Sequence, residues 1–471
     1  MLLAVALIIL IVGSVLFHIL SPWYLTPLAS NWSMIDFTID VTFWVTGFVF
    51  VAVNAFMAYC IIKFRYNKER RSEYQPENHK LELWLTGITA VGVAAMLAPG
   101  LWVWAEFVTV PEDADEIEAL GQQWHWSYRL PGDDGKFGNV DAKLISDDNP
   151  FGMDPDDPHG QDDRLIESNG VHLPVGRNVK INLRAKDVLH NFTVPQFRVK
   201  MDMVPGLVSY LWLQPTEAGE YEVLCEELCG IGHFAMRGKV VVDEAVDYDA
   251  WYAAQPTYAD ILARPQGDPV AGQARYAVCV ACHGAQGEGM QVMNAPKIAG
   301  QEDWYLRRQL NYYKTGVRGA HPQDVFGQQM APMVMTLATD QAMEDVIAYI
   351  GNLPDQPAAA TITGDVARGE DIWVTCGACH GYEAQGLKSL NAPRMAGMTD
   401  WYLARQLENF KANIRGRHED DLYGWQMAEM ARVLKDDDAV NDVVAYVNTL
   451  GQTQVAAASL QAGAAYAGAE E

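Results

Sequence analysis

CEELCGIGHFAM, at residues 225–236, is the stretch that decides the fold of the middle of this chain. It carries four side chains that bind soft metals, with the spacing Cys-x3-Cys-x3-His-x2-Met: Cys225, Cys229, His233 and Met236. A further histidine, His190, lies 35 residues before the first of them. Thiolate, imidazole and thioether ligands select copper over harder metals, and two thiolates can bridge two copper ions. We therefore expect a binuclear copper site with one imidazole on each metal.

Two other interpretations of the cysteine pair are a disulfide, which is common in an oxidising compartment, and a zinc site. A mononuclear blue copper site needs only one cysteine, so the second thiol argues against it. Short β-rich runs separated by polar turns surround the motif, and examples are 179–183, 206–213, 221–224 and 238–242. This alternation predicts an antiparallel β-sandwich or barrel.

The C-terminal part of the chain repeats itself. A constant shift of 97 residues relates its chemistry-bearing positions, as in the pairs Cys279/Cys376, His283/His380, Trp304/Trp401, Arg318/Arg415 and Met330/Met427. One shift kept over such a long stretch indicates a duplicated structural unit. We therefore expect two copies of one helical domain, joined by a linker at 354–363.

Each repeat contains the motif Cys-x-x-Cys-His, which is typical of covalent c-type haem attachment. The residues are Cys279, Cys282 and His283 in the first repeat, and Cys376, Cys379 and His380 in the second. The two thiols would bind the vinyl groups of the porphyrin, and the imidazole would bind the iron. A thioredoxin-like redox pair or half of a zinc site could use the same spacing, but two copies with the same downstream context favour haem.

These repeats resemble the halves of periplasmic di-haem c-type cytochromes. Each has a Met-x-x-Met pattern downstream of the histidine, and a thioether suits an axial ligand because it raises the reduction potential of the iron. In that family the first methionine of the pattern binds iron, which implies Met330 and Met427 as the sixth ligands. Pro296 and Pro393 are similar to the proline that supports the proximal histidine in such cytochromes.

The N-terminal part of the chain carries membrane-spanning patterns. The runs 41–62 and 83–105 are uncharged, mostly apolar and long enough to cross the hydrocarbon core. The loop between them is basic, which places it in the cytoplasm and everything after Glu106 outside it. Residues 1–20 form a third apolar run, either a signal peptide or a retained span. We expect a retained helix, because the run lacks a basic n-region and a convincing cleavage site.

The formal net charge of the chain is −26. Residues 107–471 carry 28 basic against 53 acidic residues, so the acid is concentrated outside the membrane. Such a surface repels phosphate, which excludes nucleic acid as a partner. A basic or neutral protein partner, or solubility alone, would account for the excess of acid.

Residues 37–245 resemble subunit II of cytochrome c oxidase, with two spans followed by a cupredoxin domain. The strings Val194-Pro195-Gln196-Phe197-Arg198-Val199-Lys200 and Val204-Pro205-Gly206 fit that family. The resemblance implies that copper is bound by the backbone carbonyl of Glu227 and by the side chains of His190, Cys225, Cys229, His233 and Met236. It also implies that the Glu227 side chain binds a magnesium ion shared with subunit I.

The segment Gln123-Trp124-His125-Trp126-Ser127-Tyr128 is similar to the aromatic segment that lies over the copper site in this family. There the first tryptophan receives electrons from a soluble cytochrome c, which makes Trp124 the matching residue. The chain has His125 where the family commonly has an aromatic residue, and Gln196 where it commonly has an acid. Because haem domains are fused to this chain, one of its own haems is a candidate donor to Trp124.

These expectations combine into one layout: a membrane anchor, a cupredoxin β-barrel and two all-α cytochrome c domains. The expected boundaries are 1–36 for the N-terminal apolar segment, 37–106 for a transmembrane hairpin, 107–250 for the copper domain, 269–356 and 363–451 for the cytochrome c domains, and 452–471 for a disordered tail.

The expected function is that of the electron-accepting subunit of a haem–copper terminal oxidase in a bacterial inner membrane, with the copper and haem domains in the periplasm. Two haem c groups and a copper pair would relay electrons from an upstream cytochrome or quinol-oxidising complex to subunit I. There O2 would be reduced to water with proton pumping, and subunit III is a further expected partner. The rival interpretations are the copper subunit of a nitric oxide reductase and a free-standing membrane electron shuttle. The order of the two haems stays open.

Overall fold

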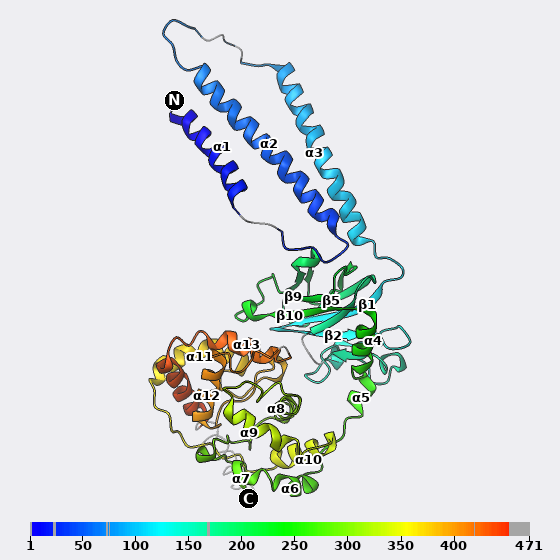
Figure 1. The fold of residues 1–471 in the computed structure, drawn as a ribbon, viewed down its shortest axis with the longest axis vertical. Helices are drawn as coiled ribbons and strands as arrows, with labels where there is room; N and C mark the ends of the chain where they lie inside the picture. Colours follow the sequence, from blue (N-terminus) through cyan, green and yellow to red (C-terminus); the bar gives the residue numbers. More distant parts are fainter. Residues whose placement is uncertain are drawn as a thin grey trace, which may run out of the picture.

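The computed structural model describes residues 2–21, 25–71, 74, 76–166, 170–418 and 420–451. Three long helices stand at one end of the molecule, two β-sheets lie in the middle, and a helical module lies at the other end (Figure 1). This is the predicted order of anchor, β domain and helical repeats. The tail at 452–471, for which we expect disorder, lies outside the described residues.

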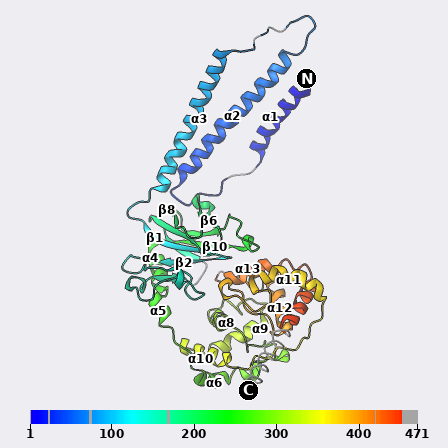
Figure 2. The same cartoon turned by 180° about the vertical axis from the view of Figure 1, so that it is seen from behind.

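Three helices are long and apolar enough to cross a membrane: α1 (Leu2–Leu20), α2 (Ser33–Lys63) and α3 (His79–Val108). Their most apolar windows have mean hydropathies of 2.9, 2.1 and 1.7. Large apolar side chains are exposed all around them, as expected for helices whose outer surface faces lipid. The first apolar run therefore forms a helix, and it lies beside α2 (Figures 1 and 2).

The base of the anchor is held to the β domain by buried polar contacts. The Trp32 indole, just before α2, donates a hydrogen bond to the Trp212 carbonyl at 3.0 Å. The guanidinium of Arg198 forms a bidentate ion pair with Asp36 in the first turn of α2, with a shortest contact of 2.6 Å. Bidentate pairs fix orientation as well as distance, so these contacts set how the β domain sits on the anchor.

The β domain consists of two five-stranded sheets, with the strand orders β3-β2-β1-β5-β8 and β4-β10-β9-β6-β7. The strands are β1 (Asp115–Gln122), β2 (His125–Leu130), β3 (Arg164–Ile166), β4 (Gly170–Pro174), β5 (Val179–Ala185), β6 (His190–Val194), β7 (Val199–Met203), β8 (Ser209–Leu213), β9 (Gly219–Leu224) and β10 (Arg237–Asp243). Their inward side chains form one continuous core that includes Trp126, Phe192 and Phe197. The predicted cupredoxin-like β domain is thus confirmed.

The expectation of a purely antiparallel sheet is wrong at two places. β1 pairs with β5 in parallel, and β10 pairs with β4 in parallel. Both pairs join strands that are far apart in the sequence, and such pairing depends on the path of the intervening chain rather than on local alternation. The pairs β1–β2 and β9–β10, whose strands follow one another in the sequence, are antiparallel as predicted.

A buried ion cluster supports the hairpin whose turn carries Trp124. The guanidinium of Arg129, on β2, contacts the Glu118 carboxylate at 2.6 Å and the Asp163 carboxylate at 3.0 Å. All three side chains are almost fully buried. Removing one member of such a cluster leaves an unpaired buried charge, so the cluster keeps β1 and β2 in one geometry.

The two helical repeats share one plan. The first contains α6 (Pro269–Tyr276), α7 (Val280–His283), α8 (Asp303–Thr315), α9 (Val325–Val334) and α10 (Asp340–Gly351). The second contains α11 (Val366–His380), α12 (Asp400–Lys411), α13 (Leu422–Ala431) and a last helix over residues 437–451. Before them, α4 (Ala245–Ala254) and α5 (Tyr258–Leu262) join the β domain to the first repeat, and Tyr258 is buried against the β domain.

The chain folds back after the first repeat. α13 of the second repeat lies next to the β domain, whereas α6 and α10 of the first repeat lie at the end farthest from the membrane helices (Figures 1 and 2). α13 contacts η4 (His233–Ala235), the short 3-10 helix that carries a predicted copper ligand. The repeat that comes later in the sequence is therefore the one beside the predicted copper site.

Candidate metal and haem sites

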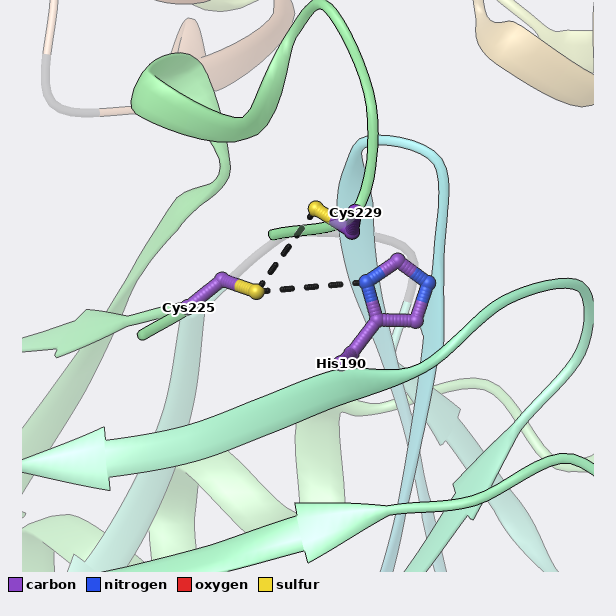
Figure 3. Close-up of side chains that lie close together, drawn as sticks. All are labelled: His190, Cys225 and Cys229. Atoms are coloured by element: carbon purple, nitrogen blue, oxygen red, sulfur yellow. Dashed lines mark hydrogen bonds between the residues drawn. The ribbon is translucent and has the colours of Figure 1, made fainter. Parts of the chain in front are cut away.

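Three predicted copper ligands meet at one end of the β domain. Cys225 follows β9, Cys229 lies in the next loop, and His190 begins β6 (Figure 3). The Cys225 sulfur lies 3.7 Å from the Cys229 sulfur and 3.9 Å from His190 Nδ1. All three side chains are buried. Strands far apart in the sequence thus bring two thiols and an imidazole to one point.

The other predicted copper ligands border the same sulfurs. His233 Nδ1 lies 3.5 Å from the Cys229 sulfur, and the Met236 thioether lies 3.8 Å from it. The backbone carbonyl oxygen of Glu227 lies 3.2 Å from the Cys225 sulfur. The structure therefore brings the whole predicted set together. Glu227, whose carboxylate is predicted to bind magnesium, is half-buried, and within the described ranges no second group of three or more His, Cys, Asp or Glu side chains brings its ligand atoms together.

The chemistry of this site fits a copper pair. The distance between the two sulfurs is far beyond the length of a disulfide, about 2.05 Å, so the cysteines are free thiols. Hydrogen bonding between them lowers the pKa of Cys225 and raises the pKa of Cys229, so the pair holds one proton in common. A bound cation would replace that proton and keep both sulfurs as thiolates.

An acid that the sequence analysis missed orients one imidazole. The Asp187 carboxylate lies 2.8 Å from His190 Nε2 and also accepts a hydrogen bond from the backbone N–H of Gln123 at 2.7 Å. With Nε2 held by the acid, Nδ1 faces the thiols as an acceptor. The Asp-x-x-His spacing is the feature of the sequence that could have identified this pair. Asp187 thus ties the imidazole to the turn that carries Trp124.

Trp124 lies directly over the copper loop. Its indole N–H donates to the Cys229 carbonyl at 3.0 Å, and the residue is only 8% exposed. The ring packs against Gly230 and Gly232, where an added Cβ atom would lie 3.0 and 2.5 Å from ring atoms. Glycine is required for this approach, so the loop sequence between Cys229 and His233 serves the contact with Trp124.

A cavity lies at each Cys-x-x-Cys-His motif, and residues of both repeats line each cavity. At the first motif a cavity of about 1660 Å³, counting the part open to solvent, is lined by Cys279, Cys282, His283 and Met330 and reaches His380 and Met427 of the second repeat. In the second repeat a cavity of about 1010 Å³ is lined by Cys376, Cys379, His380 and Met427. The neighbouring Met333 and Met430 line these cavities too, so position alone does not separate the two methionines of each pair.

The proximal histidines are held in one tautomer. His283 Nδ1 lies 2.8 Å from the Pro296 carbonyl oxygen, and His380 Nδ1 lies 2.7 Å from the Pro393 carbonyl oxygen. Burial lowers the pKa of both imidazoles, so both are neutral, with Nδ1–H donating and Nε2 free to bind a metal. The two prolines therefore support the histidines through their carbonyl groups.

The surroundings of two buried arginines indicate whether the cavities suit haem. Arg318 donates to Gln309 and to Tyr402 of the other repeat, at 2.7 and 3.2 Å. Arg415 donates across the boundary in the opposite direction, to Tyr305 at 3.0 Å and to Gln309 at 2.9 Å. Their partners are neutral, and within the described residues Nε of each arginine has no hydrogen-bond partner.

A buried guanidinium is costly unless an anion compensates it. Both arginines line the cavity at the first motif, and Arg415 also lines the cavity at the second motif. A haem group would bring its propionate carboxylates to these positions, so the cavities fit haem in charge as well as in thiol and imidazole ligands.

The second repeat is joined to the Trp124 turn. The Gln426 side-chain amide, one residue before Met427, donates to the Trp124 carbonyl. The Gln122 amide donates to the Ser389 carbonyl at 2.5 Å. Ala378 and Cys379 also pack against the core of the β domain. The haem motif of the second repeat therefore lies at the interface with the copper site.

His125 contributes to the same interface. Its ring meets the ring of Tyr423 edge-to-face, with centroids 5.6 Å apart, and the Asn391 amide lies 3.3 Å from its Nε2. Burial, with the nearby charge of Arg308, lowers the pKa of His125 to about 3, so the ring is neutral. His125, one of the two positions noted above as departing from the pattern that the chain resembles, thus faces the chain's own second repeat.

Two family profiles match this chain. The profile described as cytochrome c oxidase subunit II, periplasmic domain, matches residues 116–245, and the profile described as cytochrome c matches residues 269–354 and 366–451. Both matched parts contain the sites described above.

The chain is also similar to individual proteins. The chain is 58% identical over 263 residues to the alternative cytochrome c oxidase subunit 2 of Bradyrhizobium diazoefficiens, covering 55% of this chain and 95% of the relative. It is 28% identical over 225 residues to the cytochrome c oxidase subunit 2 of Cereibacter sphaeroides, covering 44% and 74%. Among solved structures, reduced recombinant cytochrome c4 from Pseudomonas stutzeri is 29% identical with a TM-score of 0.32, covering 38% of this chain and 97% of that one.

Proposed function

Because the chain belongs to the cytochrome c oxidase subunit II family and carries two cytochrome c domains, we propose that it relays electrons in a fixed order. Electrons reach the haem of the first repeat, pass to the haem of the second repeat, and cross at Trp124 to the copper pair. From there they pass to subunit I, where O2 is reduced to water with proton pumping. The observation that carries this order is the contact of the second repeat with the Trp124 turn.

The proposed cofactors are one haem c in each repeat and a binuclear copper pair held by the six ligands. When bound, haem iron and the copper pair each accept and release one electron at a time. Cys279 and Cys282 attach the first haem, with His283 and Met330 as axial ligands. In the second repeat Cys376 and Cys379 attach the haem, and His380 and Met427 are the axial ligands.

The residues at the junction supply a short connection between the two proposed sites. Gln426 is covalently adjacent to Met427, and its amide donates to the Trp124 carbonyl. The Trp124 indole in turn donates to the carbonyl of Cys229 at 3.0 Å. Two hydrogen bonds and short covalent segments thus link a proposed iron ligand to a proposed copper ligand. Electron transfer depends steeply on such distances, which supports the second repeat as the direct donor.

Within the helical module, Arg318 and Arg415 hold the two cavities together. Each guanidinium contacts side chains of the opposite repeat. Both arginines line the cavity at the first motif, and Arg415 also lines the cavity at the second motif. We propose that they bind haem propionates and keep the two haems close to one another. This arrangement supports transfer between the repeats before transfer to copper.

The family and the apolar helices support the proposed partners and location. Three helices anchor the chain in a membrane, and the copper domain matches a periplasmic domain. We propose the bacterial inner membrane, association with subunits I and III, and an upstream cytochrome or quinol-oxidising complex as donor. The Glu227 carboxylate is proposed as a magnesium ligand at the boundary with subunit I.

The choice of axial methionine is tested by histidine substitution. Met330→His and Met427→His should each lower the midpoint potential of one haem, on the order of 0.2 V, because imidazole lacks the preference of the thioether for ferrous iron. The far-red band of methionine-bound ferric haem should disappear for that haem. Met333→His and Met430→His are the matched controls and should leave both properties unchanged. The reverse pattern would assign the second methionine of each pair as the ligand.

The overall function is tested with the complex purified from its native membrane. We expect a large subunit with many spans to copurify, and the complex to consume O2 without turning over nitric oxide. Nitric oxide turnover without O2 consumption would identify a nitric oxide reductase instead. A chain that purifies alone and transfers electrons without a partner would identify a free-standing shuttle.

A further inference from the structure

The duplication allows the docked face of the second repeat to be traced onto the first repeat. Among the contacts of the second repeat with the β domain, Ser389 contacts Gln122, Tyr423 contacts His125, and Gln426 contacts Trp124. Their counterparts 97 residues earlier are Val292, Phe326 and Gln329. Because the two repeats share one plan, these counterparts occupy the equivalent face of the first repeat.

That equivalent face is open. Val292 is 86% exposed, its neighbour Met293 is 47% exposed and Phe326 is 38% exposed, and Gln329 is also exposed. Ser389, Leu390, Tyr423 and Gln426 are only partly exposed in the second repeat. We call the residues Val292, Met293, Phe326 and Gln329 the open face. It is the uncovered copy of a surface that the chain itself uses for docking.

The open face borders the cavity of the first haem motif. Met293, Phe326 and Gln329 line the same cavity as Cys282 and His283. A protein seated on the open face would therefore approach the haem edge as closely as the β domain approaches the second cavity. This proximity distinguishes the open face from other exposed apolar positions, such as Val270 on α6, which does not line the cavity.

The open face has no charged side chain of its own, and the Arg405 guanidinium of the second repeat packs over the Phe326 ring at its border. The segments 289–296 and 325–336 contain no Asp, Glu, Lys or Arg, whereas the equivalent segments of the second repeat contain Lys388, Arg432 and others. Val325, Met333 and Met335, in the second of these segments, are also exposed. Contiguous exposed apolar patches mark interaction sites. A bilayer is an unsuitable occupant, because the first repeat extends to the end of the molecule opposite the membrane helices (Figures 1 and 2).

We propose that the open face is the docking site for the external electron donor, a soluble one-electron carrier protein that presents an uncharged apolar surface over its redox centre. The β domain supplies the precedent around Trp124, where it meets the second repeat with Trp124, His125 and Gln122, none of which is charged there. The same interface also has charged contacts, in which Lys388 pairs with Asp148 and Arg237 lies over the Trp425 ring. The first-repeat counterparts of Lys388 and Trp425 are Gln291 and Gln328, so these charged contacts have no equivalent on the open face. This inference rests on the proposed relay and adds the surface at which the relay begins.

The test uses the full-length chain, loaded with copper and haem, and a reduced soluble mono-haem c-type cytochrome as the probe. Stopped-flow absorbance gives the second-order rate constant for haem reduction. Val292→Glu and Val292→Lys should both lower it by at least roughly tenfold, because either charge must be desolvated in the complex. Val270→Glu and Val270→Lys, on the same repeat at a position 78% exposed, are the matched controls and should stay within about twofold.

Two results would overturn the proposal. One is a rate constant for both Val292 variants within about twofold of the unsubstituted protein. The other is acceleration by one charge and slowing by the other, which would indicate long-range steering instead of a buried contact. Unchanged haem and copper absorbance shows that each variant is folded and loaded.

The relay itself is tested separately in the same samples. A small-molecule reductant bypasses protein docking, so electrons it places on haem should reach copper equally fast in the Val292 variants and in the unsubstituted protein. Copper that stays oxidised in the unsubstituted protein would contradict the relay, whatever the docking rates are. If copper is reduced normally but the Val292 substitutions leave the rate constant for haem reduction by the protein donor unchanged, only the proposed docking site is contradicted.

Discussion

Cys225→Ser should abolish the near-infrared band of the copper pair and stop electron delivery to subunit I. Serine keeps the size of the side chain but replaces a thiolate that would bridge both copper ions, and its hydroxyl is a poor ligand for copper. We expect donor-driven O2 consumption by the complex to fall at least roughly 100-fold, equivalent to about 2.7 kcal/mol of activation free energy. Both haems should still be reduced at the normal rate, because the repeats do not depend on Cys225.

The matched control is Cys60→Ser. Cys60 is a free cysteine in α2, remote from the cluster of His190, Cys225 and Cys229. It should leave copper content, the near-infrared band and O2 consumption unchanged. A Cys225→Ser protein that keeps the band and its full copper content would rule out the proposed ligand set.

Removal of the second haem should disconnect the first haem from copper. In Cys376→Ala/Cys379→Ala no thiol remains to attach haem to the second repeat, the repeat that contacts Trp124. The protein donor should still reduce the first haem, but copper reduction should slow at least roughly 100-fold, again about 2.7 kcal/mol. Stopped-flow absorbance in the haem and near-infrared regions follows both steps.

The duplication supplies the matched control for this experiment. Cys279→Ala/Cys282→Ala removes the haem of the first repeat and should slow reduction by the protein donor. An electron placed on the remaining haem by a light-activated reductant should still reach copper at the normal rate. Copper reduction that survives loss of the second haem but fails on loss of the first would reverse the proposed order.

Much of the site could be predicted because its residues lie close together in the sequence. The Cys-x3-Cys-x3-His-x2-Met spacing led to a set that the structure gathers around two sulfurs 3.7 Å apart. Asp187 was missed, because an acid three residues before a histidine is common and only the fold aims it at His190 Nε2.

The order of the repeats could not be predicted, because it depends on how a whole domain folds back. Gln426 and Trp124 are 302 residues apart, and no local pattern pairs them. The contacts that Arg318 and Arg415 make with the opposite repeat could not be predicted for the same reason, although the sequence shows the 97-residue spacing of the two arginines. Parallel pairing of β1 with β5 likewise depends on the path of the chain.

The interface also explains the unusual residue at position 125. An aromatic residue suits a surface visited by a soluble donor, whereas His125 is buried against Tyr423 and Asn391 of the same chain. A permanent intramolecular partner can be recognised by specific polar contacts, because it does not have to dissociate after each electron. Docking of the external donor then moves to the first repeat.

The central claim is that electrons reach copper from the second haem, and time-resolved absorbance after a light pulse tests it most directly. Met330→His gives the first haem a distinct spectrum, so the two haems can be followed separately in one full-length protein. We predict that the near-infrared band of oxidised copper disappears in step with reoxidation of the methionine-ligated haem of the second repeat, while the histidine-ligated haem passes its electron to that haem. Copper reduction in step with direct reoxidation of the histidine-ligated haem, with no electron passing through the second repeat, would contradict the account.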